Sequence, residues 1–117
     1  MPDSESKAKS NVQLKGILAH TASWARILDD GRIELEFYDH SPEAESHLGG
    51  DVAWMYWIAA TEKPRLIALL QTHTGATITD DRTLLDVLYA NFDDTWAIRD
   101  WLKENGIPYD EKFDSSA

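Results

Sequence analysis

The chain has 117 residues, 43% of them hydrophobic and 10% aromatic, and its 21 acidic and 11 basic residues leave a net charge of −10. This length suits one domain with one core, the composition is unlike that of disordered chains, and the lack of cysteine excludes disulfides, cysteine-ligated zinc and thiol catalysis. No apolar run approaches the roughly 20 residues that span a bilayer, and the start "MPDSESKAKS" lacks the apolar region of a secretory signal, so we expect a soluble cytoplasmic protein.

The two ends of the chain are predicted to be tails. Residues 1–12 are polar and show no periodicity, which is typical of a disordered segment. We expect a single α+β domain over residues 13–108. Residues 109–117 then form a C-terminal tail that lies on the surface or adds contacts through Tyr109 and Phe113.

A β-hairpin is the first clear element of the domain. The segments "SWARIL" and "RIELEFY" flank Asp30 and Gly31, a pair favoured in a two-residue type I′ turn because both positions need positive φ. This turn pairs Leu28 with Ile33 and sets the two faces of the hairpin. The predicted core face holds Trp24, Arg26, Leu28, Ile33, Leu35 and Phe37. The predicted outer face holds Ser23, Ala25, Ile27, Glu34, Glu36 and Tyr38.

The segment "DVAWMYWIAA", residues 51–60, predicts a central strand. Every position after Asp51 is apolar and the segment is rich in aromatics, which indicates a strand covered on both faces. Its alternating sets are Val52, Trp54, Tyr56 and Ile58 on one face and Ala53, Met55, Trp57 and Ala59 on the other. Sequence alone leaves open which set faces the helices.

Three helices follow the strands. Thr61 can cap residues 62–73, which end before Gly75, and Thr79 can cap residues 80–92. Asp94 can cap residues 95–105, and a left-handed Gly106 would form a Schellman motif there.

The stretch "DHSPEAESHLGGD", residues 39–51, is the strongest candidate for a metal site. His40 and His47 lie six residues apart across a loop containing proline and glycine, with Asp39 and Asp51 beyond them. This spacing does not force the ligands to converge, and no H-E-x-x-H, H-x-H or EF-hand pattern is present. We therefore expect a turn and an acidic loop with no metal.

Catalytic motifs give no support for an enzyme. The chain lacks a G-x-S-x-G elbow, a Walker A loop and a G-x-G-x-x-G loop, and 21 carboxylates make any single carboxylate pair uninformative. Stacking platforms for single-stranded nucleic acid need a basic groove, whereas the aromatics here lie among acidic residues. We expect neither catalysis, nor a cofactor, nor nucleic-acid or membrane binding.

Together these elements predict an α+β fold: an antiparallel hairpin or meander of three or four strands, followed by three α-helices packed on one face of the sheet. In size, charge and build, carried by "RIELEFYDHSPEAESHLGGDVAWMYW", the chain resembles the immunity proteins that neutralise bacterial nuclease toxins, including those of contact-dependent growth inhibition systems. The resemblance implies an acidic inhibitor that covers the basic active-site cleft of a toxin nuclease domain.

The residues expected to bind such a partner are the carboxylates and aromatics at and before the loop, and one aromatic of the following strand: Glu34, Glu36, Tyr38, Asp39, Glu43, Glu45, Asp51 and Trp57. One alternative is a cytoplasmic regulatory or adaptor domain whose protein partner is not a toxin. A further alternative is a small metal-dependent hydrolase that uses His40, His47 and Asp51.

Overall fold

The computed structural model describes residues 8–16, 21–39 and 52–114. In chain order the described elements are β1 (Ala8–Gln13), β2 (Thr21–Leu28), β3 (Ile33–Asp39), β4 (Val52–Ile58), the 3-10 helix η1 (Ala60–Glu62), α2 (Lys63–Thr74), α3 (Asp81–Asn91), α4 (Thr95–Glu104) and β5 (Asp110–Asp114).

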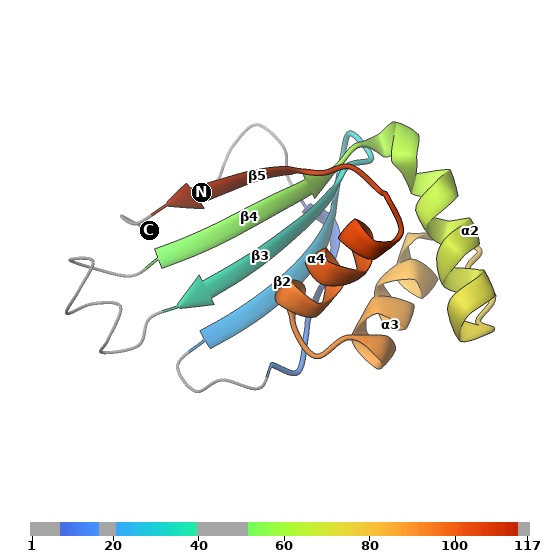
Figure 1. Ribbon diagram of the computed structural model, residues 1–117, viewed down its shortest axis with the longest axis horizontal. Coiled ribbons are helices and arrows are strands. Elements are labelled where there is room, and N and C mark those ends of the chain that lie inside the picture. The colour runs from blue at the N-terminus through green and yellow to red at the C-terminus, as the bar shows by residue number, and fades with distance from the viewer. Residues whose placement is uncertain (1–7, 17–20, 40–51, 115–117) are drawn as a thin grey trace.

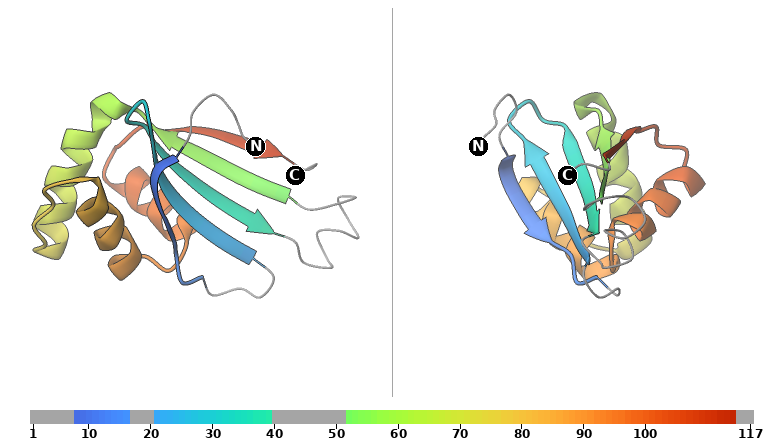
Figure 2. Two further views of the ribbon diagram at one scale, coloured as in Figure 1. Left: turned by 180° about the vertical axis from the view of Figure 1, so that it is seen from behind. Right: turned by 90° about the vertical axis from the view of Figure 1, so that its left-hand side faces the viewer.

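The strands form one antiparallel sheet in the order β1-β2-β3-β4-β5, so every strand pairs with its neighbour in sequence. All three α-helices lie on the same side of this sheet (Figures 1 and 2). The predicted α+β class, with strands first and helices packed on one face, is confirmed. The sheet of the described chain has five strands, where three or four were expected.

The core lies between the sheet and the helices. Ile33, Leu35 and Phe37 of β3 are buried in alternation with half-buried Glu34, Glu36 and Tyr38. The helices contribute one apolar stripe each to the same cluster, because a surface helix buries the side chains that recur every three or four residues. The fully buried side chains of the helices include Leu66, Leu70, Leu84, Leu85, Ile98 and Leu102.

The β2–β3 turn differs from the two-residue turn predicted from the sequence. Leu28 donates its N–H to the carbonyl of Arg32 at 2.9 Å, Gly31 donates to Leu28 at 3.0 Å, and Gly31 has φ 93°. These bonds enclose a three-residue loop that ends in a left-handed glycine, the next most common hairpin. The Asp30 carboxylate supports the loop by accepting from the backbone N–H of Arg32 at 3.0 Å and from its Nε at 2.8 Å.

The longer loop shifts the hairpin register by one residue, so the predicted faces of β2 are wrong. Ile27, rather than Leu28, stands opposite Ile33, and Ala25 stands opposite Leu35. A shift of one residue exchanges the two faces of a strand. Ala25 and Ile27 are therefore in the core, while Trp24 and Arg26 lie on the face with Glu34 and Glu36; the predicted faces of β3 are unchanged.

Both predicted tails contain a strand. Residues 8–12, assigned to the N-terminal tail, belong to β1, which pairs with β2 from Ala8↔Leu28 to Gln13↔Trp24. Residues 110–114, assigned to the C-terminal tail, form β5 on the outer edge of β4. Three helices separate β5 from its partner β4 along the chain, so local periodicity carries little of the signal for this strand.

The central position of β4 is confirmed, because it pairs with β3 on one side and β5 on the other. The register places Trp54, Tyr56 and Ile58 on the helix side, opposite Phe37, Leu35 and Ile33. Ala53, Met55 and Trp57 lie on the other side, with Tyr38, Glu36 and Glu34.

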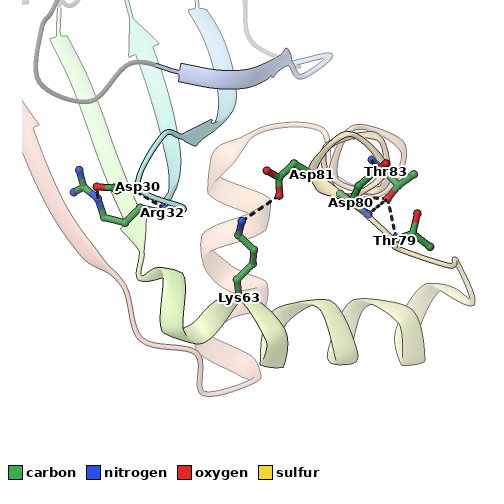
Figure 3. Close-up of polar contacts among 7 residues, drawn as sticks. All are labelled: Asp30, Arg32, Lys63, Thr79, Asp80, Asp81 and Thr83. Carbon is green, nitrogen blue, oxygen red and sulfur yellow. Dashed lines mark hydrogen bonds and ion pairs between the residues drawn. The ribbon is translucent and has the colours of Figure 1, made fainter.

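The helix ends follow the capping residues with small shifts. Asp80, rather than Thr79, caps α3: its carboxylate accepts from the Thr83 N–H at 2.8 Å, and the Thr83 hydroxyl accepts from the Asp80 N–H at 3.1 Å, forming a capping box (Figure 3). Lys63 of α2 forms an ion pair with Asp81 at 3.1 Å and links α2 to the start of α3 (Figure 3).

The other two helices have one wrong cap and one correct cap. Glu62, rather than Thr61, precedes α2, and Gly75 ends it with φ 76°. Asp94 caps α4 as predicted, and its carboxylate accepts from the Ala97 N–H at 3.0 Å. After α4, Ile107 donates to the Leu102 carbonyl at 3.0 Å and Gly106 has φ 69°, which confirms the Schellman motif.

Across the described ranges, no helix is long and apolar enough to cross a membrane.

Candidate functional site

The side of the sheet that faces away from the helices is the candidate functional site, here called the open face. Its side chains form three rows across the strands, because residues paired between neighbouring strands share a face. The first row is Asn11, Arg26, Glu34, Trp57 and Asp110; the second is Gln13, Trp24, Glu36, Met55 and Lys112; the third is Ala22, Tyr38, Ala53 and Asp114.

Arg26 lies at the centre of a polar network on the open face. Its Nη1 is 2.8 Å from Oε1 of Glu36 and 3.3 Å from Oε1 of Glu34. The Trp57 indole N–H donates to the other oxygen of Glu34 at 2.9 Å. The Arg26 guanidinium also lies 5.3 Å from the ring centre of Trp24, within the range of a cation–π contact. The network therefore links β2, β3 and β4 through side chains.

Glu34 and Glu36 lie on the outer face as predicted, but Arg26, which was assigned to the core face, lies there with them. The side chains of Arg26, Glu34 and Glu36 are about one-fifth exposed, at 23%, 18% and 21%. The arginine therefore neutralises part of the charge of the two glutamates. The negative charge of the open face extends to its β5 edge, where Asp110 and Asp114 flank Lys112.

The predicted partner-binding residues divide into three groups. Glu34, Glu36, Tyr38 and Trp57 lie together on the open face. Asp39 ends β3 on the opposite side from Tyr38 and is half-buried. Glu43, Glu45 and Asp51 lie outside the described residues, as do His40 and His47 of the metal alternative.

The five tryptophans are divided between the two sides of the sheet. Trp24 and Trp57 lie on the open face, half-buried. Trp54 and Trp96 pack at 5.5 Å between ring centres on the helix side, and the Trp101 N–H donates to Nδ1 of His73 at 3.1 Å. Trp24 and Trp57, together with Met55, give the centre of the open face an apolar component between its charges.

A small hollow borders the open face where β4 ends and β5 begins. It has a volume of about 150 Å³ and is lined by Trp57, Ala59, Glu62, Pro108, Tyr109 and Asp110. Pockets that enclose small-molecule ligands usually have volumes of about 300 to 1,000 Å³. The hollow therefore suits one side chain or head group better than a whole substrate.

The side chains described next, whose pKa values are shifted, lie away from the open face. Burial raises the pKa of Tyr56 on the helix side to about 12, and the positive charge of Arg99 partly opposes this rise. The backbone N–H of Thr83 lowers the pKa of the capping residue Asp80, and that of Arg32 lowers the pKa of Asp30 in the hairpin loop. These shifts have structural causes, namely a core phenol, a helix cap and a turn.

Within the described ranges, no group of three or more histidine and carboxylate side chains could hold a metal ion. Comparison with protein families, with curated proteins and with solved structures gives no match for this chain.

The sequence did not predict that several other residues lie on the open face. Asp110 and Lys112 were assigned to a tail, and Arg26 and Trp24 were assigned to the core. Tyr109 and Phe113 would lie on one face of a strand and the charged Asp110, Lys112 and Asp114 on the other, which is a weak strand signal that could have indicated β5.

Proposed function

We propose that this chain is a protein-binding inhibitor, an immunity protein that neutralises a cognate nuclease toxin by covering its basic active-site cleft with the open face. The observation that supports this most directly is the arrangement of the open face itself. Trp24 on one side, and Met55 and Trp57 on the other, flank Glu34 and Glu36 of the central strand β3, and charged residues of β5 form one edge of the face. Half-buried aromatic side chains combined with charged residues are typical of a protein-binding site.

The net charge of the whole chain supports a partner with a basic surface. A net charge of −10 repels nucleic acid at long range and attracts a basic surface. A nuclease cleft that binds phosphates is such a surface. Carboxylates on the open face would occupy positions that phosphates otherwise take, and the aromatic centre would slow dissociation.

Because Arg26 pairs with Glu34 and Glu36, these two glutamates have a different role from the carboxylates of β5. Glu34 and Glu36 are held in place by Arg26 and Trp57, so they form a preorganised surface whose side chains lose little freedom on binding. Asp110 at the β5 edge is more exposed and contributes mainly to long-range attraction.

The experiment that tests this function is co-expression with the product of the gene immediately upstream, because an immunity gene directly follows its toxin gene. We expect the upstream product alone to stop growth and this chain to restore it. Met55→Arg, which places a bulky cation at the centre of the open face, should abolish the rescue. The control Ala90→Arg adds the same side chain to an exposed position of α3 and should retain it.

Far-UV circular dichroism and melting of both variants show whether they are folded. Rescue by a folded Met55→Arg variant would contradict binding through the open face. An upstream product that binds the chain but is harmless to cells would favour the adaptor alternative.

A further inference from the structure

We infer that the hollow at the edge of the open face, here called the Trp57 hollow, receives the cationic head group of one arginine or lysine side chain from the basic partner protein. The hollow is defined by Trp57, Ala59, Glu62, Pro108, Tyr109 and Asp110. This inference rests on the proposed function for the identity of the partner, but the affinity of the hollow for a cation can be measured without that partner.

Two distant parts of the chain build the hollow. Trp57 stands opposite Asp110 in the β4–β5 ladder, and η1 begins directly after β4 and brings Glu62 to the same place. The Schellman motif after α4 and the following Pro108 direct the chain into β5. β4 leads into η1 at the end of the sheet where the chain from α4 enters β5 (Figure 1), and the lining residues place the hollow at this end.

The lining of the hollow has two carboxylates and no cation. Asp110 is exposed and forms no ion pair with any described residue. Glu62 forms an ion pair with Arg65 of α2 at 3.6 Å. The Arg65 guanidinium also donates to the carbonyls of Gly106 at 3.0 Å and Asn105 at 3.3 Å, which share its hydrogen-bonding capacity with Glu62. Asp110 is therefore the lining carboxylate that is available to pair with an incoming cation.

Two aromatic rings complete the site. Cations are attracted to the faces of tryptophan and tyrosine rings, tryptophan being the better partner. The indole of Trp57 is held by its 2.9 Å hydrogen bond to Glu34, and Tyr109 packs edge-on against Tyr56 at 5.6 Å. Both rings are therefore fixed before a ligand arrives, which lowers the entropy cost of binding.

Size and position favour a side chain of a partner protein over a free small molecule. A volume of about 150 Å³ accommodates a guanidinium or ammonium group with part of its alkyl stem. Trp57 and Asp110 belong to the first row of the open face, so a partner that covers this face also covers the hollow. The cation would then be removed from water, where its attraction to the carboxylates and rings is stronger.

The test uses the isotope-labelled full chain and nuclear magnetic resonance of its indole N–H groups. The probe is arginine blocked at both ends as an amide, and the matched neutral probe is blocked citrulline, which has nearly the same shape without the charge. Trp57→Phe identifies the Trp57 signal. At constant ionic strength we expect the arginine probe to shift this signal saturably and the citrulline probe to leave it in place.

Variants separate the hollow from general attraction to an acidic protein. Asp110→Asn should weaken binding of the arginine probe by roughly threefold, the size expected for one exposed ion pair. The control Glu111→Gln removes the same charge from the next residue, which is exposed and lies outside the hollow, and should have a smaller effect. Equal weakening by both variants, or an equal shift with citrulline, would overturn the inference.

Tetramethylammonium tests whether a free small cation is the occupant. Binding of this ion more tightly than the arginine probe would overturn the assignment to a partner side chain. None of these titrations requires the upstream gene product, so failure of the proposed function and failure of the hollow give different results. If both hold, Asp110→Asn should also raise the dissociation rate of the complex with the upstream product, while Glu111→Gln should not.

Discussion

Arg26 of β2 lies 2.8 Å from Glu36 and 3.3 Å from Glu34 on the neighbouring strand, so a single guanidinium pairs with two carboxylates on the open face. Pairs of this kind are worth little when fully exposed and more when partly buried, because water screens them less. These side chains are only about one-fifth exposed. The network therefore contributes both to stability and to the shape of the surface that a partner would meet.

The first prediction concerns reversal of these charges. Glu34→Lys with Glu36→Lys should lower the free energy of unfolding by about 1 to 3 kcal/mol, because two ion pairs become repulsions against Arg26. Adding Arg26→Glu should recover a large part of the loss. Urea denaturation measures all three proteins, and the control Glu104→Lys with Glu111→Lys changes two exposed carboxylates that have no ion pair among the described residues. Equal losses in the two double variants would show that the network adds no stability.

The second prediction concerns the core side of the same strand. Leu35 is completely buried, so Leu35→Ala should leave a cavity and lower the free energy of unfolding by about 2 to 5 kcal/mol. Glu34→Ala, the neighbouring residue on the open face, should cost less because no core cavity results. Urea denaturation with an unchanged m-value would attribute the loss to the native state. A loss of less than about 1 kcal/mol for Leu35→Ala would contradict the core assignment of this face.

The third prediction concerns pH and the cap of α3. The pKa of Asp80 is lowered below its usual value of 3.8, mainly by the Thr83 backbone N–H. A lowered folded-state pKa means that this carboxylate stabilises the protein fully above pH 3.8 and loses the effect as the pH falls through the folded pKa. Asp80→Asn keeps a capping oxygen but cannot titrate.

The measurement is the melting temperature of the wild type and Asp80→Asn over a series of acidic pH values. The wild type should be the more stable protein near neutrality, and the difference should shrink as the pH falls below 3.8. A difference that stays constant across the series would show that Asp80 does not titrate in this way.

The fourth prediction concerns the rate of partner binding. With a net charge of −10, association with a basic partner should slow markedly as salt rises, while dissociation should change less. Stopped-flow measurement at several ionic strengths tests this. Association rates that do not depend on salt would remove electrostatic attraction from the mechanism.

The fifth prediction concerns residues 39–51, where sequence raises the possibility of a metal site. We expect protein treated with a chelator to melt at the same temperature as protein supplied with zinc, manganese or calcium, because a metal bound to the native state would raise that temperature. His40→Ala with His47→Ala should retain the fold. A stoichiometric metal in purified protein that is lost in this double variant, with a drop in melting temperature, would instead favour the hydrolase alternative.

Structural features that depend on residues close together in the chain could be predicted from the sequence. Gly75 and Gly106 end their helices with positive φ, and Asp94 caps α4, because each interaction joins residues within about one helical turn. The alternation of β3 likewise gave the correct core face. The error at the start of α3 is one residue, since Thr79 and Asp80 are both capping types and only the fold distinguishes them.

The candidate site depended on interactions that are not local. The choice between a two-residue and a three-residue loop after Leu28 decided whether Arg26 faced the core or the two glutamates. Both loops are compatible with Asp30-Gly31, so the sequence around the turn does not distinguish them.

The sequence by itself determined the α+β class, the positions of the three helices and the inward side chains of β3, because periodicity and capping depend on near neighbours in the chain. Only the tertiary structure decided the register of β2, the addition of β1 and β5 at the sheet edges, and the meeting of Trp57 with Asp110. These features depend on backbone hydrogen bonds between segments that can be far apart in the chain, and such pairing is selected by how the whole sheet packs against its helices.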